Sequence, residues 1–558
     1  MYRCNTAIST AETWTAGHWT QVKVGGEVSD LKSAIENITD SIDNNGAYPF
    51  AIVDAGGKAA VVIDKDGFTS LNIKHIVADE AGISHTDDSG MKTQEYRGDG
   101  IYDYAVCDKD GKILFCVDKG ILKVHAIETA ETTDKKIDKV ISDLKWILSN
   151  KYKNGTFDAE VNMFICYGQS WAEGYDAEAV TLTSRYDNLM LDIGIRNNPL
   201  NDMNQTATSF VPMVEANGTA TGPGSQLVGE TPVSAQSNMI KQLIQAENGY
   251  SYTDFPYQIL GTTPGYGSRT LVQLAKGTDY YNRLIVQVGQ ANTIASALGK
   301  KLVVQAFSWA QGDLGTGATG TYAQNLEQLR VDIDTDVKAI TGQTQDVKCI
   351  TWQSFLYTAN KAREFYDKYV GASETYPNII CSGATYHLDN VASGNLHFTS
   401  ESQDWLGAYF GIAYKRTIID GEKFIPLKPI SASHSGNVLW VTFNVPQKPL
   451  VIDTDRVSLA DNYGFNLYAS DTTEKSIASV SIVSPDTIKI VCGSAIATTD
   501  YLTYAQNAGS TYNRTTGNRG NLRDSQGNYI TYLSGVNSTL AMHNWCVVFN
   551  KTIAEMEA

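Results

Sequence analysis

The sequence lacks any apolar run near the roughly 20 residues that a helix needs to cross a bilayer. Its first residues, MYRCNTAIST, also lack the basic and then apolar pattern of a secretory leader. Positive charge is scarce, because 44 Lys and Arg stand against 61 Asp and Glu, which gives a net charge of −17. That imbalance removes the attraction on which nucleic-acid and anionic-membrane binding depend. We therefore expect neither a nucleic-acid partner nor membrane insertion.

Paired cysteines are missing as well. The eight cysteines stand singly, mostly inside apolar runs, and none forms a Cys-x-x-Cys pair. Structural zinc and a dense disulfide framework are therefore not expected, and without an HExxH motif no metal or other cofactor is indicated. Cys107 and Cys116 could face each other across a hairpin, although buried free thiols fit better. Such cysteine usage is typical of assembly in a reducing compartment.

At 558 residues the chain is too long for one ordinary core. Its composition changes along its length and predicts several parts. These are an aromatic N-terminal module with a short helix at 1–47, β-hairpin repeats at 48–130, a helix and linker at 131–157, an α/β domain at 158–420 and a C-terminal β-sandwich at 421–558.

The N-terminal parts contain an internal repeat. FAIVDAGGKAAVVIDKDG, from Phe50, returns as YAVCDKDGKILFCVDKG, from Tyr104, and each copy has two apolar strands around a Gly-containing turn. This pattern predicts two β-hairpins. Residues 133–149 then predict a helix with an apolar stripe, suited to packing or to a short multi-chain coiled coil. Because neither hairpins nor stripe can easily bury its apolar face alone, we expect a homo-oligomer, a trimer above all.

The α/β part is marked by short apolar runs that alternate with helical patterns. Strands are expected in MFICY, KLVVQAFSWA, DVKCITW and NIICSG, and helices in VQVGQANTIASALGK, in TYAQNLEQLRVDIDTDVKAITG and in SESQDWLGAYFGIAYKR. This alternation predicts a parallel sheet covered on both faces. Beyond Phe424 the helical period disappears, and VLWVTFNV, SVSIVS, TIKIVCG and NWCVVF predict a β-sandwich.

The first candidate site residue stands where a buried strand ends, in MFICYGQSWAE. Open α/β sheets bind ligands at the carboxyl edge of their strands, so Ser170 is either a nucleophile or the N-cap of the next helix. The α/β part holds only two histidines, His387 and His397. His397 precedes the last helix, which makes it the candidate base.

Two further segments carry groups that could stabilise an oxyanion. In FSWAQGDLG another apolar strand ends, on Gln311 and Asp313, and an amide there could donate to a developing negative charge. In TTPGYGSRTLVQL the glycines Gly265 and Gly267 allow close approach of a carbonyl oxygen, or form a simple turn, ahead of an expected helix.

In this order, GQS after a strand, a Gly-Ser loop, WAQGD and a late histidine before a helix with LG resemble the SGNH hydrolases. The sialate O-acetylesterase and acetylxylan esterase branch is the most similar, over residues 158–416. The resemblance implies a flavodoxin-like three-layer α/β/α fold and removal of acetyl groups from glycan hydroxyls through an acyl-serine. It implies Ser170 as nucleophile, His397 as base, and an oxyanion hole formed by Ser170, Gly267 and Gln311.

The acid that orients His397 remains open. Many SGNH hydrolases carry Asp three residues before the histidine, where this chain has Gly394. Related enzymes use the acidic residue of the Gln-Gly-acid motif, which is Asp313 here; Asp389 or a backbone carbonyl are alternatives. We expect Asp313, because the strand before it places it rigidly.

The N-terminal stretches YRCNTAIST and TWTAGHWTQVKVG resemble modules of phage and prophage tail proteins. This resemblance implies a tailspike-like receptor-binding protein that acts on an acetylated polysaccharide, in a virion tail or an extracellular setting. Two alternatives stay open, which are a non-catalytic glycan-binding adhesin and a structural tail protein with an inactive SGNH-like domain.

Overall fold

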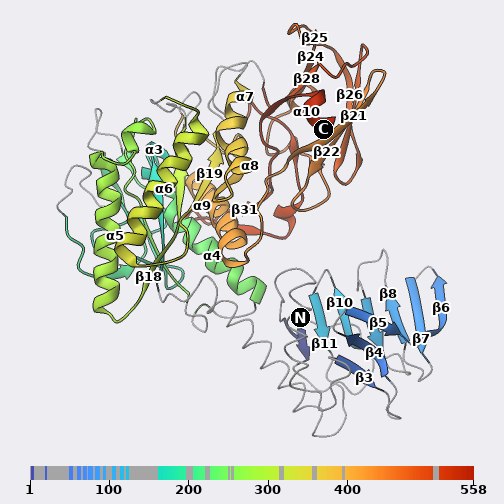
Figure 1. Ribbon diagram of the computed structural model, residues 1–558, viewed down its shortest axis with the longest axis horizontal. Helices are drawn as coiled ribbons and strands as arrows, with labels where there is room; N and C mark the ends of the chain where they lie inside the picture. Colours follow the sequence, from blue (N-terminus) through green and yellow to red (C-terminus); the bar gives the residue numbers. More distant parts are fainter. Residues whose placement is uncertain are drawn as a thin grey trace. The chain divides into compact units, whose positions relative to one another are not determined.

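The structure is a computed structural model of residues 1–558 (Figure 1). It divides into two compact units, residues 1–158 with 243–255, and residues 159–242 with 256–558. Up to residue 124 it describes the backbone of the strands given below, and beyond them residues 161–196, 205–219, 227–248, 252, 257–312, 319–354, 361–391, 396–506 and 514–557. The helices expected within 1–47 and over 133–149, and the residues Asp313 and Gly394, lie outside the described residues.

Up to residue 124, the described part of the first unit consists of β-strands. An eight-stranded sheet has the order β2-β1-β11-β10-β9-β8-β7-β6, and a three-stranded sheet has the order β3-β4-β5. The strands are β1 (Tyr2–Cys4), β2 (Trp19–Gln21), β3 (Phe50–Val53), β4 (Ala59–Asp64), β5 (Gly67–Leu71), β6 (Ile73–Asp79), β7 (Gly82–Asp87), β8 (Lys92–Glu95), β9 (Tyr104–Cys107), β10 (Ile113–Asp118) and β11 (Ile121–Val124).

Both predicted hairpins are confirmed, since β3 pairs antiparallel with β4 and β9 with β10. The two copies of the repeat nevertheless belong to different sheets. The register of β9 and β10 also shows whether Cys107 and Cys116 stand opposite each other. Cys107 stands opposite Ile113, whereas Cys116 stands opposite Ala105, so the two cysteines do not face each other across the hairpin.

A seven-stranded sheet organises the second unit, which is mixed α/β. Its order is β14 (Phe210–Pro212), β13 (Leu189–Leu191), β17 (Gln258–Thr262), β12 (Val161–Gly168), β18 (Leu302–Ala310), β19 (Lys348–Gln353) and β20 (Ile379–Ala384). Neighbouring strands are parallel except β13 and β14. Every residue of β12 and β18 is buried, which explains why both are mostly apolar and do not alternate between apolar and polar residues.

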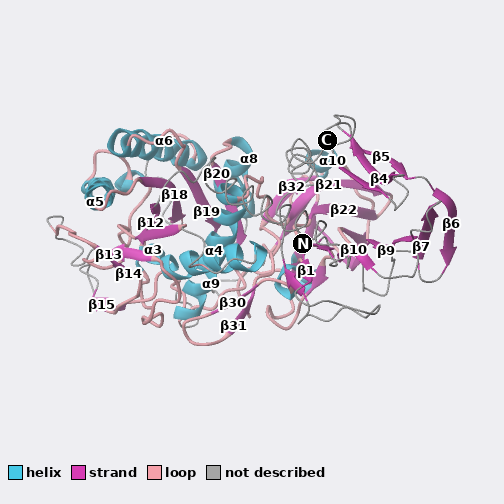
Figure 2. Ribbon diagram, turned by 90° about the horizontal axis from the view of Figure 1, so that it is seen from below, coloured by secondary structure: helices cyan, strands magenta, loops and turns pink. Residues whose placement is uncertain are grey.

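Helices cover both faces of this sheet. In Figure 2, α5 (Asp279–Ala297) and α6 (Tyr322–Thr341) lie on one side, while α4 (Pro232–Asn248) and α9 (Ser400–Tyr414) lie on the other. Two glycines of α9 allow α9 and α4 to pack closely against each other. A Cβ on Gly407 would stand 2.3 Å from the carbonyl oxygen of Pro232, and one on Gly411 would stand 2.8 Å from that of Gln236.

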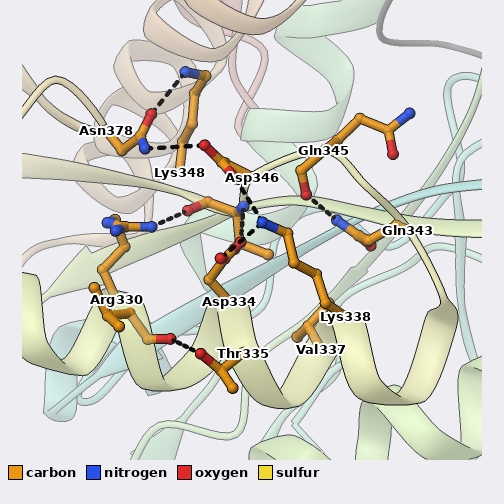
Figure 3. A network of polar contacts seen from close by, with 12 residues as sticks. Arg330, Asp334, Thr335, Val337, Lys338, Gln343, Gln345, Asp346, Lys348 and Asn378 are labelled. Carbon is orange, nitrogen blue, oxygen red and sulfur yellow. Dashed lines mark hydrogen bonds and ion pairs between the residues drawn. The ribbon is translucent and has the colours of Figure 1, made fainter.

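The start and stop expected for α6 are confirmed. Thr321 forms a capping box with Gln324, and Gly342 ends the helix in the left-handed region with φ 70°. Figure 3 shows the polar network that fixes the turn into β19. Lys338 Nζ lies 2.9 Å from a carboxylate oxygen of Asp334, whose other oxygen accepts the backbone N–H of Val347 at 2.8 Å.

The C-terminal region of the second unit is antiparallel. One four-stranded sheet has the order β21 (Lys428–Ser435), β22 (Val438–Asn444), β27 (Thr487–Cys492) and β26 (Ile477–Ser484). The other has the order β25 (Glu474–Lys475), β24 (Phe465–Tyr468), β28 (Tyr501–Tyr504) and β32 (Phe549–Thr552). Two short pairs complete it, β23 (Val451–Ile452) with β29 (Leu522–Arg523) and β30 (Thr531–Leu533) with β31 (Thr539–Ala541).

The strand expected in NWCVVF is wrong except for its last residue, Phe549, which opens β32. A side chain takes the place of a neighbouring strand here. The amide of Gln353, at the end of β19, accepts the N–H of Val548 at 2.6 Å and donates to its carbonyl at 2.8 Å. The C-terminal region is thereby joined directly to the parallel sheet.

Candidate active site

The predicted site residues come from the carboxyl ends of adjacent parallel strands. Ser170 follows β12, the loop with Gly267 follows β17, and Gln311 follows β18. Gly168 lets the end of β12 close on β18, because a Cβ there would stand 2.3 Å from the carbonyl oxygen of Ala310. The chain then enters the single turn of α3 (Ser170–Glu173).

Ser170 and His397 are in hydrogen-bond contact. The Oγ of Ser170 lies 2.9 Å from Nε2 of His397, and the serine is 5% exposed. The alternative in which Ser170 is the N-cap of the helix is wrong, because Gln169 occupies the N-cap position. His397 is held from both sides, because its carbonyl accepts the N–H of Val391 and the preceding carbonyl, of Leu396, accepts the indole N–H of Trp171.

A carboxylate contacts the other ring nitrogen of His397, so that Ser170, His397 and this carboxylate form a continuous row of hydrogen-bond contacts. The Nδ1 of His397 lies 2.6 Å from Oδ2 of Asp176, a residue that the sequence analysis missed. The short turn of α3 ends at Gly174 in the left-handed region, and Asp176 has φ 61°, so the chain reverses sharply after the serine. The N–H of Asp176 then donates to the carbonyl of Leu227 at 2.8 Å, which fixes the carboxylate beside the imidazole.

Of the two acids expected from the sequence, the structure describes only Asp389, and its carboxylate binds other partners than the imidazole. Asp389, the alternative, binds arginines of the C-terminal region, with Oδ2 at 2.9 Å from Arg456 Nη2 and Oδ1 at 2.6 Å from Arg514 Nε. Asp313 lies outside the described residues, so its own position is untested. The one signal for Asp176 in the sequence was an acidic residue just after GQSWAEG, where a glycine stops the turn.

His387, the other histidine of the α/β part, takes no part in this row. Its side chain is fully buried, and its ring is stacked on that of Trp545 at a centroid distance of 5.2 Å.

Two backbone N–H groups lie beside the nucleophile. A Cβ on Gly267 would stand 3.8 Å from the Cβ of Ser170, so this loop packs against the serine. Among the described residues, the N–H groups of Ser170 and Gly267 have no well-aligned acceptor. Gln311 donates through Nε2 to the carbonyl of Arg269 at 3.0 Å and accepts the hydroxyl of Tyr322 at 2.6 Å. Its use as an oxyanion donor stays a prediction.

Aromatic side chains form the rim of the site. The ring of Tyr175 lies 5.0 Å from that of His397. Tyr266 and Tyr280 are 4.6 Å apart, and the guanidinium of Arg269 lies 4.7 Å from the Tyr266 ring and donates to the Tyr280 hydroxyl at 2.9 Å. All four side chains are partly exposed. The loop ahead of Tyr280 forms a short 3-10 turn, Val272–Leu274, rather than the expected helix.

Buried carboxyl groups gather behind the serine. Burial raises the pKa of Glu173 to about 8, against the opposing effect of Arg283. Burial, followed by the charge of Glu230, also raises the pKa of Glu215 to about 8, and Arg196 opposes this. These groups favour the neutral acid near pH 7.

Neither a metal site nor a membrane span emerges from the described residues. They contain no group of His, Cys, Asp and Glu side chains suited to holding a metal ion. Of the helices that the structure describes, none is long and apolar enough to span a membrane.

Comparison with known proteins gives matches in structure only. No protein-family model and no curated protein matches the chain. A carbohydrate acetylesterase from Xanthomonas citri is 10% identical with a TM-score of 0.44, over 84% of this chain and 94% of that chain. NanS is 13% identical with a TM-score of 0.31, over 47% and 97%. A carbohydrate acetylesterase from Sinorhizobium meliloti is 12% identical with a TM-score of 0.24, over 46% and 97%. At this level of similarity, the case for function rests on the geometry of the site.

Proposed function

We propose that the chain is a carbohydrate O-acetylesterase that acts by serine acyl transfer. The observation that carries the proposal is the continuous row of Ser170, His397 and Asp176, with contacts of 2.9 and 2.6 Å, at the carboxyl edge of the parallel sheet. A serine paired with an imidazole, which a carboxylate orients in turn, is the arrangement that makes a hydroxyl nucleophilic.

In the acylation step, Nε2 of His397 takes the proton of Ser170 while the Oγ attacks the acetyl carbonyl. The carboxylate of Asp176 holds the Nδ1–H tautomer and stabilises the imidazolium that forms. The negative charge that develops on the carbonyl oxygen is stabilised by the N–H groups of Ser170 and Gly267. The tetrahedral intermediate collapses when the sugar oxygen leaves and receives the proton from Nε2.

In the deacylation step, a water molecule takes the place of the sugar alcohol. His397 removes one of its protons as the water oxygen attacks the acyl-serine, and the same oxyanion donors act again. Return of the proton to Ser170 Oγ releases acetic acid and restores the free serine.

The sugar part of the proposal is supported by the rim of the site and by the sequence resemblance. Tyr175, Tyr266 and Tyr280 present partly exposed rings beside the nucleophile, and such rings pack against the apolar faces of sugars while their hydroxyls remain in water. The order of the GQS, Gly-Ser, WAQGD and histidine motifs resembles esterases that deacetylate glycans.

The decisive experiment measures acetate release from p-nitrophenyl acetate and from an acetylated polysaccharide. Ser170→Ala should abolish turnover and keep the circular dichroism spectrum of the wild type. Ser296→Ala, an exposed serine of α5, serves as the matched control and should retain full activity. Glycan binding by a wild-type protein without turnover would instead support the adhesin.

For the biological setting, we propose a homotrimeric, tailspike-like protein that acts on glycans outside the host cell. The support is the resemblance of the N-terminal stretches and the apolar stripe at 133–149. Light scattering tests the assembly, and a monomer at micromolar concentration contradicts it.

A further inference from the structure

The carboxyl group of Glu173 is buried close to the nucleophile, without a well-aligned hydrogen bond among the described residues. Glu173 closes the single turn that Ser170 opens, and its side chain is 1% exposed. Neither carboxylate oxygen has a hydrogen-bond partner among the described residues. A buried carboxyl group without a partner is costly to keep, so its presence beside a reacting serine calls for a reason.

The carboxyl group of Glu173 lies against the backbone of Gly267. A Cβ on Gly267 would stand 3.2 Å from Oε2 of Glu173 and 3.8 Å from Cβ of Ser170, so both side chains border one glycine. The N–H of Gly267 faces the carboxylate without making a well-aligned bond to it. In the proposed mechanism, that N–H is one of the two donors that stabilise the oxyanion.

We propose that Glu173 is a positioning residue of the oxyanion hole, and that acyl transfer requires its neutral, protonated form. This inference rests on the proposed function. As a neutral acid, Glu173 leaves the N–H of Gly267 available to the substrate oxygen. As a carboxylate, it would draw that N–H to itself and place a negative charge beside the developing oxyanion. Both effects act on the transition state, so they change kcat rather than KM.

The charged groups around Glu173 do not form an ion pair with it. Arg283, from α5, donates to the carbonyls of Pro264 and Gly265. Arg196, after β13, donates to the carbonyls of Gly229 and Ala216.

The surroundings of Glu173 favour the neutral acid near pH 7. Burial raises its pKa to about 8, while Arg283, the Gly267 N–H, Arg196 and Arg269 lower it in part. On the rim, burial and the charges of Glu173 and Asp176 raise the pKa of Tyr175.

The test is the pH dependence of kcat with p-nitrophenyl acetate between pH 6 and 9.5, corrected for spontaneous hydrolysis. Wild-type kcat should fall by roughly tenfold or more above pH 8, with KM unchanged. Glu173→Gln, which is neutral at every pH, should keep kcat within about threefold of the wild type at pH 7 and lose the alkaline fall. Glu178→Gln removes an exposed carboxylate of the same segment and should keep the wild-type profile.

A wild-type kcat that stays level to pH 9.5 overturns the proposal, as does an alkaline fall that persists in Glu173→Gln. If Glu173→Gln does not fold, the wild-type profile decides, with circular dichroism showing that the protein is folded at pH 9.5. Failure of the proposed function is distinct from these outcomes, because the wild type would then release no acetate at any pH.

Discussion

The carboxylate of Asp176 lies 2.6 Å from Nδ1 of His397, although Asp176 stands in the segment directly after the nucleophile, Ser170. Nucleophile and acid therefore come from one short reversal of the chain, and the histidine reaches them from a loop more than two hundred residues away. A shift of the turn between Ser170 and Asp176 would therefore disturb both the nucleophile and the acid.

Asp176→Asn should lower kcat by roughly a hundredfold to ten-thousandfold, because an amide can stabilise the wrong imidazole tautomer and carries no charge for the imidazolium. Acetate release at saturating substrate measures this effect.

Asp389→Asn is the matched control for Asp176→Asn. It removes the negative charge that pairs with Arg456 and Arg514, and it should lower the melting temperature while leaving kcat within severalfold. Equal losses of kcat in both variants would contradict the assignment of Asp176.

Gln311→Ala should lower kcat by roughly a hundredfold to a thousandfold if the amide donates to the oxyanion. The same side chain braces the loop after β17 through the carbonyl of Arg269, at 3.0 Å. Steady-state kinetics separate the two roles, since a change confined to KM makes Gln311 a binding residue. Tyr322→Phe, which removes only the hydroxyl that Gln311 accepts, should have a much smaller effect.

Gly535→Val should destabilise the protein by about 1 to 3 kcal/mol, as expected for overpacking. A Cβ on Gly535 would stand 2.6 Å from the Val180 side chain and 3.0 Å from the N of Thr181, in the segment that follows Asp176. Turnover should fall together with the melting temperature. Gly289→Ala, where a Cβ in α5 would meet nothing within 4 Å, should instead stabilise by about 0.5 to 1 kcal/mol.

The raised pKa values of two buried glutamates should make the free energy of unfolding fall as the pH rises from 7 to 9. In the folded protein the pKa values of Glu173 and Glu215 are both raised to about 8, whereas unfolded glutamates ionise near their ordinary value of about 4.3. Between those values the folded state holds more protons than the unfolded state, so stability decreases with pH and the loss is complete above pH 8.

Glu215→Gln tests this dependence on pH. Its hydroxyl donors, Thr231 and Ser234, can bind the amide oxygen, so the variant should fold. It should lose less stability between pH 7 and 9 than the wild type, as measured by melting temperature. Glu178→Gln, on the exposed surface, should leave the slope unchanged.

Several features followed from the sequence because short-range physics decides them. The short apolar run Met163–Tyr167 in β12 is typical of a strand buried on both faces, and Gly342 has the conformational freedom that the stop of α6 requires. The position of Ser170 after a buried strand, and of His397 before the last helix, predicted that both reach one sheet edge, as they do.

Other features escaped the sequence because distant partners decide them. Helix α4 buries polar side chains whose partners lie far away in the sequence, since Gln236 accepts the hydroxyl of Ser308 and Asn238 accepts the side-chain amide of Asn188. The apolar residues Met239, Ile240, Leu243 and Ile244 do stand at helical spacing, so the segment carried a signal that the sequence analysis did not use. The strand expected in NWCVVF failed because a distant side chain, that of Gln353, supplies the hydrogen bonds of Val548.

The acid of the candidate triad shows the same division. The sequence by itself placed a serine after a buried parallel strand and a histidine ahead of the last helix, and so predicted that both lie near the carboxyl edge of the sheet. Only the tertiary structure decided that Asp176 completes the row. Its carboxylate reaches His397 because Gly174 turns the chain in the left-handed region and the carbonyl of Leu227, fifty-one residues further on, holds the N–H of Asp176 in place.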